Sequence, residues 1–157
     1  STAGVLLAKR LSMGFLDTDL TIQLAEGRRL QDILDSDGLD AFREIEERIV
    51  CSIRPERTVV ATGGSVVYGQ RAMRHLCGLG FAVWLDLSFD LLAARVLNLD
   101  SRGVVMAPGM TLRELYDERR PLYAKWADAV LDCGGLDLEE TVDALDCLSL
   151  SAGAGAP

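Results

Sequence analysis

Two carboxylates near the start of the chain have the type and spacing for chemistry. Asp17 and Asp19 stand two residues apart and follow a short apolar segment that we expect to be a strand. At the end of a strand such a pair can face one pocket, hold magnesium through water and accept a proton from a hydroxyl group. The same pair also suits a solvated turn that caps the next helix, so its meaning depends on its surroundings.

The chain opens with Ser1 and Thr2, which lead directly into a predicted helix at 2–13. A parallel α/β sheet would have a strand before this helix. Ser or Thr is also the residue that follows Gly-Lys in the phosphate-binding motif G-x-x-x-x-G-K-S/T, although both are common helix caps. We therefore expect that a first strand and a glycine loop with its lysine precede Ser1.

The rest of the hydrophobic pattern alternates between strand-like and helix-like segments. This alternation predicts an α/β fold of three layers, in which a central parallel sheet lies between helices. Ligands bind such sheets beyond the carboxyl ends of the strands, where Asp17, Asp19 and the segment Gly63-Gly64-Ser65 stand. We expect strands at 15–17, 58–62, 81–87 and 129–133, and further helices at 20–26, 30–36, 37–51, 70–79, 89–97, 111–127 (interrupted at Pro121) and 138–147.

The length and composition are typical of one ordinary globular domain. Of the 157 residues, 49% are hydrophobic and 25% are charged, which is enough to bury a core without disulfides or a structural metal. We expect a single domain over 1–150, an aperiodic loop at about 98–110 and a flexible tail at 151–157.

The charges, apolar runs and cysteines exclude several classes of function. The formal net charge of −8 argues against nucleic acid or an anionic membrane as a partner. No apolar run approaches the roughly 18–20 residues of a membrane span. The single histidine has no cysteine at ligand spacing, so a zinc site is not expected. We interpret Cys51, Cys77, Cys133 and Cys147 as small buried hydrophobes in a reducing cytoplasm.

Four segments, in this order, resemble shikimate kinase. They read F-L-D-T-D, D-G-L-D-A-F-R-E-I-E-E, V-V-A-T-G-G-S-V-V and R-R-P-L-Y-A-K-W-A-D, and the resemblance runs from Ser1 to about Cys147. It implies a P-loop kinase fold, similar to nucleoside monophosphate kinases, with five parallel strands in the central sheet. Four strands are visible here, which agrees with a first strand ahead of Ser1. The implied reaction is ATP-dependent phosphorylation of a shikimate hydroxyl, giving shikimate 3-phosphate for aromatic amino-acid biosynthesis, in a cytoplasmic monomer.

The resemblance implies a role for each matching residue on the side of the phosphate acceptor. Asp19 would contact the substrate hydroxyls and orient or deprotonate the attacking oxygen. Arg43 and Arg119 would bind the substrate carboxylate, because the guanidinium fork bonds both of its oxygens. Gly63 and Gly64 would present backbone N–H groups to the substrate.

On the side of the nucleotide, the resemblance implies that Ser1 and Thr2 end the phosphate-binding loop. The Ser1 hydroxyl would bind Mg²⁺ directly, and Asp17 would hold the ion through water. Arg95 would lie against the adenine ring of ATP. Arg102, in a lid formed by the loop at about 98–110, would reach the transferring phosphate and neutralise its charge.

Three positions depart from the family pattern. Ser65 replaces the third glycine of a triplet, so it narrows the pocket or bonds a different ligand. Gly103 replaces the proline after the lid arginine, and Leu39 replaces a glutamate. Two alternatives therefore stay open: a kinase of the same fold that acts on another small hydroxy-acid, and a non-catalytic kinase-like binding domain.

Overall fold

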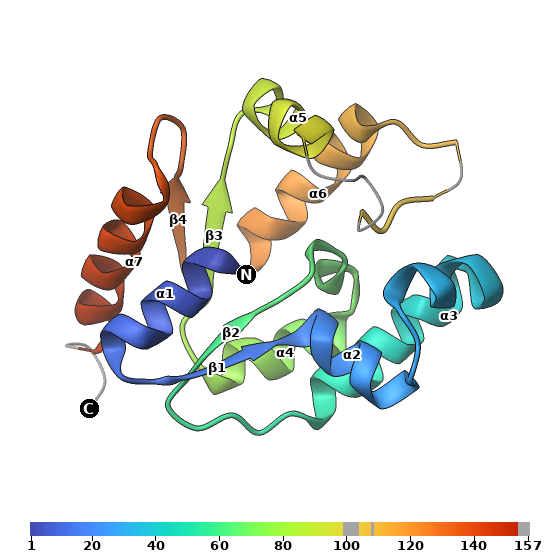
Figure 1. The fold of residues 1–157 in the computed structure, drawn as a ribbon, viewed down its shortest axis with the longest axis horizontal. Coiled ribbons are helices and arrows are strands. Elements are labelled where there is room, and N and C mark those ends of the chain that lie inside the picture. The colour runs from blue at the N-terminus through green and yellow to red at the C-terminus, as the bar shows by residue number, and fades with distance from the viewer. Residues whose placement is uncertain (99–103, 108, 154–157) are drawn as a thin grey trace.

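The computed structural model describes residues 1–98, 104–107 and 109–153. In this part of the chain short strands alternate with helices, as the sequence predicts (Figure 1). All strand pairing is parallel, and it forms two separate pairs, β1 with β2 and β3 with β4. The elements are α1 (Thr2–Leu11), β1 (Gly14–Asp17), α2 (Thr18–Glu26), α3 (Leu30–Ser52), β2 (Thr58–Ala61), the 3-10 helix η1 (Gly64–Tyr68), α4 (Gln70–Leu79), β3 (Val83–Asp86), α5 (Phe89–Asn98), α6 (Leu112–Trp126), β4 (Ala129–Asp132) and α7 (Leu138–Gly153).

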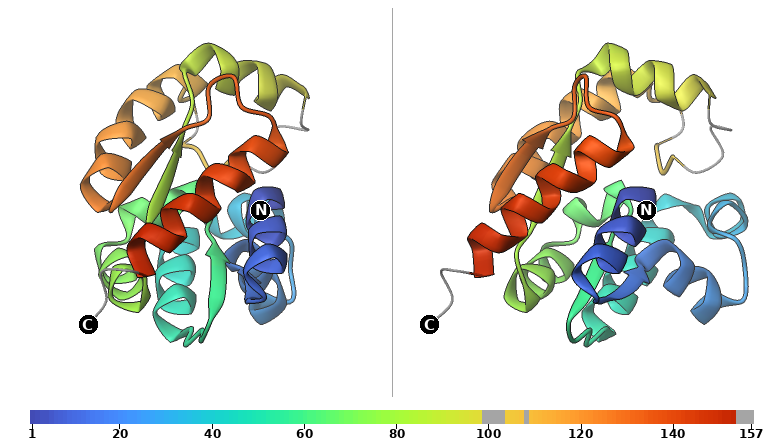
Figure 2. Two further views of the ribbon diagram at one scale, coloured as in Figure 1. Left: turned by 90° about the vertical axis from the view of Figure 1, so that its left-hand side faces the viewer. Right: turned by 60° about the vertical axis from the view of Figure 1, so that its left-hand side comes forward.

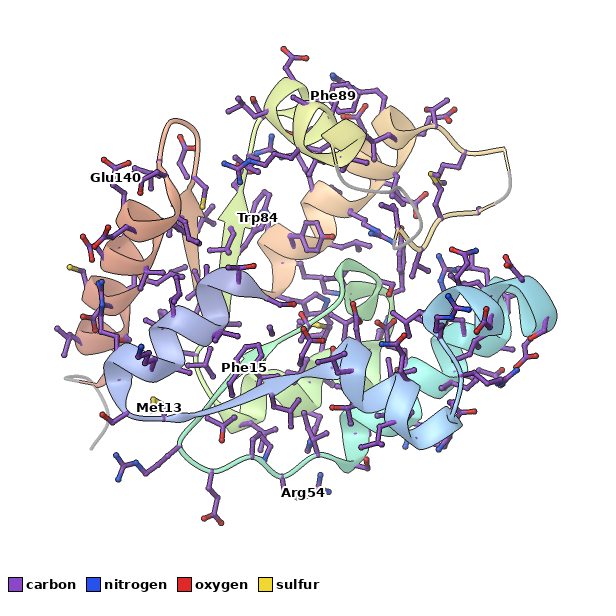
Figure 3. The ribbon with its side chains drawn as sticks, in the orientation of Figure 1. Met13, Phe15, Arg54, Trp84, Phe89 and Glu140 are labelled. Atoms are coloured by element: carbon purple, nitrogen blue, oxygen red, sulfur yellow. The ribbon has the colours of Figure 1, made fainter. Side chains whose placement is uncertain are left out.

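Helices cover both faces of the strands, which gives the three predicted layers. On one face α1 and α7 lie side by side (Figures 1 and 2). Leu7, Val142 and Leu145 of these two helices pack against side chains of β2, β3 and β4. On the other face α3, η1, α4 and α6 share a second apolar cluster. Trp84 of β3, labelled in Figure 3, ties the strands to this cluster, since its ring centroid lies 5.8 Å from that of Tyr123.

Helices α2 and α3 are held together by a third apolar cluster. It includes Phe42, which is completely buried, and it takes in Val105 from the segment between α5 and α6. Inside α3, Gly38 has φ 85° and ψ 174°, which kinks the helix. The kink explains why the sequence predicts two helices here, at 30–36 and 37–51.

Helix α6 begins at the predicted cap. Thr111 accepts a hydrogen bond from the backbone N–H of Glu114 at 3.2 Å, and the Glu114 carboxylate accepts from the N–H of Thr111 at 2.7 Å. This reciprocal pair is a capping box. The expected interruption at Pro121 is wrong, because α6 continues to Trp126. A proline removes a single N–H, here the donor to the carbonyl of Asp117, and the helix tolerates that loss.

Two further expectations differ from the structure. Helix α7 continues to Gly153, so residues 151–153 are helical instead of forming a tail, while residues 154–157 lie outside the described part. Cys147 is exposed and not buried, whereas Cys133 is buried and both Cys51 and Cys77 are half-buried. Among the described residues, no helix has the length and apolar character needed to cross a membrane.

Replacement of Gly38 by alanine should destabilise the protein by about 1–3 kcal/mol, because its backbone conformation is accessible almost only to glycine. No atom lies within 4 Å of the added Cβ, so the cost comes from the backbone and not from crowding. Urea unfolding measures the change. Gly78→Ala in α4 is the matched control: its Cβ also meets open space, and alanine there should stabilise the helix by up to ~1 kcal/mol. Equal changes in both variants would contradict this expectation.

Candidate active site

The predicted carboxylate pair lies where β1 meets α2. Asp17 caps α2, since its Oδ1 accepts hydrogen bonds from the backbone N–H groups of Asp19 at 2.9 Å and Leu20 at 3.2 Å. Its Oδ2 accepts a hydrogen bond from the Ser1 hydroxyl. The cap and the predicted site are therefore compatible, because the cap fixes the carboxylate with its second oxygen beside Ser1.

The Asp19 carboxylate lies against the end of β2. A Cβ on Gly63 would stand 2.6 Å from Asp19 Oδ1, so only glycine permits this approach. The N–H of Gly63 donates to the Thr18 hydroxyl at 3.4 Å, which draws the two strand ends together. Burial raises the pKa of Asp19 above its ordinary value, and the charge of Asp17 adds to the rise.

Arg43 of α3 and Arg119 of α6 converge on the ring of Tyr68. The guanidinium carbon of Arg43 lies 4.1 Å from the ring centroid, and that of Arg119 lies 5.5 Å from it. The Nε atoms of both arginines are buried and have no hydrogen-bond partner among the described residues. Buried donors are nearly always paired, and an unpaired one is costly. The two groups therefore favour an anionic ligand with several acceptor oxygens.

Arg119 is 8% exposed and joins three segments. One terminal nitrogen donates to the carbonyl of Val105, which lies within the segment predicted to form the lid. A Cβ on Gly64 would lie 3.0 Å from Arg119 Nη1 and 2.7 Å from the hydroxyl of Tyr123. That hydroxyl donates to the Gly64 carbonyl at 3.1 Å. Gly64, like Gly63, is therefore a position at which side chains of the site approach the backbone.

Glu46 is a site residue that the sequence did not reveal. Its side chain is 2% exposed, and it accepts a hydrogen bond from the Ser65 hydroxyl at 2.7 Å. Burial raises the pKa of Glu46 to about 7, and the charge of Asp19 adds to the rise, whereas Ser65, Arg119 and Arg43 oppose it. Its spacing of three residues from Arg43 places both on one helix face, but neighbouring glutamates offered equally plausible choices.

The structure shows fewer contacts for the residues that are predicted to bind the nucleotide. Thr2 is exposed at the start of α1, and Arg95 is exposed on α5. Burial raises the pKa of the Cys133 thiol and the Arg95 charge opposes this, so Arg95 stands near the segment that follows β4. Arg102 lies outside the described residues. Arg120, next to Arg119, pairs with Asp86 and lies over the rings of Trp84 and Tyr116 instead of Tyr68.

The oxygen atoms of Ser1 and Asp17 fit a magnesium ion. Mg²⁺ prefers oxygen ligands, and it usually combines one or two carboxylates with water and substrate phosphates. In the described part of the chain, no group of three or more acidic, histidine or cysteine side chains could hold a metal ion. A magnesium ion bound here would take most of its ligands from phosphate and water.

Comparison with known proteins identifies relatives over nearly the whole chain. The sequence model of the shikimate kinase family matches residues 1–146. The shikimate kinase of Gloeobacter violaceus is 37% identical over 153 residues, which cover 95% of this chain and 85% of that protein. The shikimate kinase of Thermodesulfovibrio yellowstonii is 34% identical over 146 residues, covering 91% of this chain and 84% of that protein.

Solved structures agree with the sequence relatives. The shikimate kinase of Acinetobacter baumannii, in complex with shikimate, superposes with a TM-score of 0.84 at 26% identity and covers 96% of this chain and 86% of that chain. The shikimate kinase of Aquifex aeolicus has a TM-score of 0.79 at 28% identity and covers 100% of this chain and 92% of that chain. The resemblance predicted from the motifs is confirmed, and this chain belongs to the shikimate kinase family.

Proposed function

We propose that this protein phosphorylates a hydroxyl of shikimate with ATP, giving shikimate 3-phosphate for aromatic amino-acid biosynthesis. The observation that carries the proposal is the convergence of Arg43 and Arg119, whose buried Nε atoms lack partners among the described residues. Asp19 provides a carboxylate that can bind hydroxyl groups. Its charge acts on Glu46, as do the charges of Arg43 and Arg119, so these side chains lie in one region of the structure. A compact hydroxy-acid uses both features, and the Acinetobacter baumannii relative was solved in complex with shikimate.

The two arginines provide the positive charge that an anionic substrate needs. The protein as a whole is acidic, with a formal net charge of −8. Buried charges are screened much less than exposed ones, so a local pair of guanidinium groups can still attract a carboxylate. Each fork bonds two oxygens in one plane, which fixes the orientation of the acid as well as its affinity.

Asp19 is suited to orient the attacking hydroxyl and to accept its proton. Its raised pKa makes the carboxylate a better proton acceptor than an exposed aspartate. Phosphoryl transfer depends mainly on in-line positioning and on neutralisation of charge, so the contact that orients the hydroxyl matters most. Gly63 and Gly64 have no side chains, so Asp19 and Arg119 can approach the backbone closely at these two positions.

We place the nucleotide at Ser1 and Thr2, with Arg95 near the adenine and Arg102 at the transferring phosphate. ATP is the donor that membership of a kinase family implies. Mg²⁺, bound by the Ser1 hydroxyl and near Asp17, would neutralise phosphate charge. The hydrogen bond between these two residues keeps their oxygens together for this purpose.

The incomplete burial of the four strands supports a further strand ahead of Ser1. Strands in a parallel sheet with helices on both faces are normally buried, yet no residue of β1 to β4 falls in the buried class. Leu85 in β3 is 44% exposed. We propose that a strand before Ser1 pairs with both β2 and β3 and leads into the glycine loop with its lysine.

The alternative of a different hydroxy-acid depended on Ser65. Its side chain is buried and its hydroxyl bonds Glu46, so it does not offer a new polar contact to a ligand. This geometry favours shikimate over an acceptor that would need the extra hydroxyl. We also propose that the protein acts as a cytoplasmic monomer.

A coupled ADP-release assay on the full-length protein tests the function. We expect ADP release that depends on shikimate, with little release when no acceptor is present, because exclusion of water from the site limits hydrolysis of ATP. Other small hydroxy-acids serve as the comparison. Release with another acid but not with shikimate would contradict the assignment, and no release with any acceptor would support a non-catalytic binding domain instead.

Arg43→Ala should raise the KM for shikimate by about 30-fold or more, since truncating one member of a buried charged pair costs roughly 2–5 kcal/mol. The KM for ATP should change less than threefold. Arg48→Ala is the matched control, because Arg48 lies on the same helix but its side chain is 63% exposed and pairs with Glu26. Equal increases in both KM values of Arg43→Ala would refute its role.

A further inference from the structure

The ring of Tyr68 contacts both arginines that we expect to bind the acceptor carboxylate. The guanidinium carbon of Arg43 lies 4.1 Å from the ring centroid, and that of Arg119 lies 5.5 Å from it. Both distances fall within the roughly 6 Å at which an aromatic ring attracts a cation. Tyr68 comes from η1, Arg43 from α3 and Arg119 from α6. One aromatic side chain therefore lies against cations from two other elements.

The ring itself is held at its hydroxyl and at its backbone. The hydroxyl donates a hydrogen bond to the Glu118 carboxylate of α6. The preceding residues of η1, Val66 and Val67, are buried in the apolar cluster that η1 shares with α3, α4 and α6. Burial raises the pKa of Tyr68 and the bond to Glu118 adds to the rise, so the phenol keeps its proton near neutral pH. The place of the ring is therefore set before any ligand binds.

An aromatic face attracts a guanidinium group without using its hydrogen-bond donors. The attraction acts between the positive charge and the negative face of the ring, so the N–H groups stay free. A carboxylate in the same place would accept hydrogen bonds from these donors and pair with the charge. The Nε atoms of Arg43 and Arg119 have no hydrogen-bond partner in the described part of the chain. The contact with Tyr68 therefore stabilises each guanidinium group and leaves its Nε donor for a ligand.

We propose, on the basis of the function above, that Tyr68 is a positioning residue for the acceptor carboxylate. Its ring holds the Arg43 guanidinium group in the orientation that binds the carboxylate, and it holds Arg119, which lies farther from the ring, to a smaller extent. A side chain that is ordered before binding avoids the entropy cost of being ordered by the ligand. Tyr68 therefore raises acceptor affinity through Arg43 and takes no part in the transfer of the phosphate.

Tyr68→Leu tests the proposal in the full-length protein, because leucine keeps apolar bulk and removes the aromatic face. The KM for shikimate should rise about tenfold, the effect of one desolvated contact between a cation and a ring, while kcat and the KM for ATP stay within threefold. Tyr68→Phe keeps the aromatic face, so all three constants should stay within threefold of the wild-type values. An unchanged shikimate KM in Tyr68→Leu, or an equal rise in both variants, would overturn the proposal.

Tyr116→Leu is the matched control. Tyr116 lies on α6, and the guanidinium carbons of Arg113 and Arg120 lie 5.9 Å and 5.3 Å from its ring centroid. Its hydroxyl is also anchored, since it donates to the Leu87 carbonyl at 2.9 Å. Neither arginine is a predicted carboxylate ligand, so the shikimate KM of this variant should stay within twofold of the wild-type value. A rise as large as that in Tyr68→Leu would overturn the proposal, because loss of any such ring would then disturb the site.

The double variant Arg43→Ala/Tyr68→Leu separates action through Arg43 from general damage to the pocket. Once the Arg43 guanidinium group is absent, the ring has lost its nearer cation. Tyr68→Leu should then raise the shikimate KM less than threefold above that of Arg43→Ala alone, because residues that act through one contact are not additive. A further tenfold rise would overturn the proposal, since the two residues would then act independently.

The Nε–H resonances of arginine in ¹⁵N-labelled protein give a readout that needs no substrate. Protons over an aromatic face are shielded, so the Arg43 resonance, assigned by its loss in Arg43→Ala, should lie upfield in the wild type and in Tyr68→Phe. It should move downfield in Tyr68→Leu. The same position in all three proteins would overturn the proposal. Absence of shikimate phosphorylation by the wild type would refute the proposed function alone, because these spectra still decide whether Tyr68 holds Arg43.

Discussion

The site depends on two arginines whose Nε atoms are buried in a strongly acidic protein. Arg43 and Arg119 are distant in the sequence, and they meet at Tyr68 because η1 packs against both α3 and α6. Holding such donors in the interior without full hydrogen bonding costs free energy. An acceptor carboxylate that bonded these donors would remove that cost. The unpaired donors would therefore lower the stability of the free protein and raise its affinity for the acceptor.

The remaining elements place acids and glycines around this pair. The cap of α2 fixes Asp17 with one oxygen beside Ser1, and the close approach at Gly63 sets the place of Asp19. Both contacts lie at the carboxyl ends of β1 and β2, the expected ligand edge of parallel strands. A helix cap therefore fixes the Asp17 carboxylate, and the missing side chain of Gly63 lets Asp19 approach the end of β2.

The sequence predicted the parts that local chemistry determines, and it missed the parts that arise only from tertiary contact. Alternating periodicity indicated the layers, and the motifs placed Asp17, Asp19 and both arginines. Nothing in the sequence singled out Glu46, because its pairing with Ser65 joins two elements that meet only in the folded chain. The same holds for Val105, whose carbonyl accepts from Arg119 while its side chain packs on the α2–α3 cluster.

A crystal structure of the full-length protein with shikimate and ADP is the most direct measurement of the central claim. The shikimate carboxylate should lie within hydrogen-bond distance of both Arg43 and Arg119, with a ring hydroxyl on Asp19. A carboxylate bound elsewhere in that complex would contradict the assigned geometry.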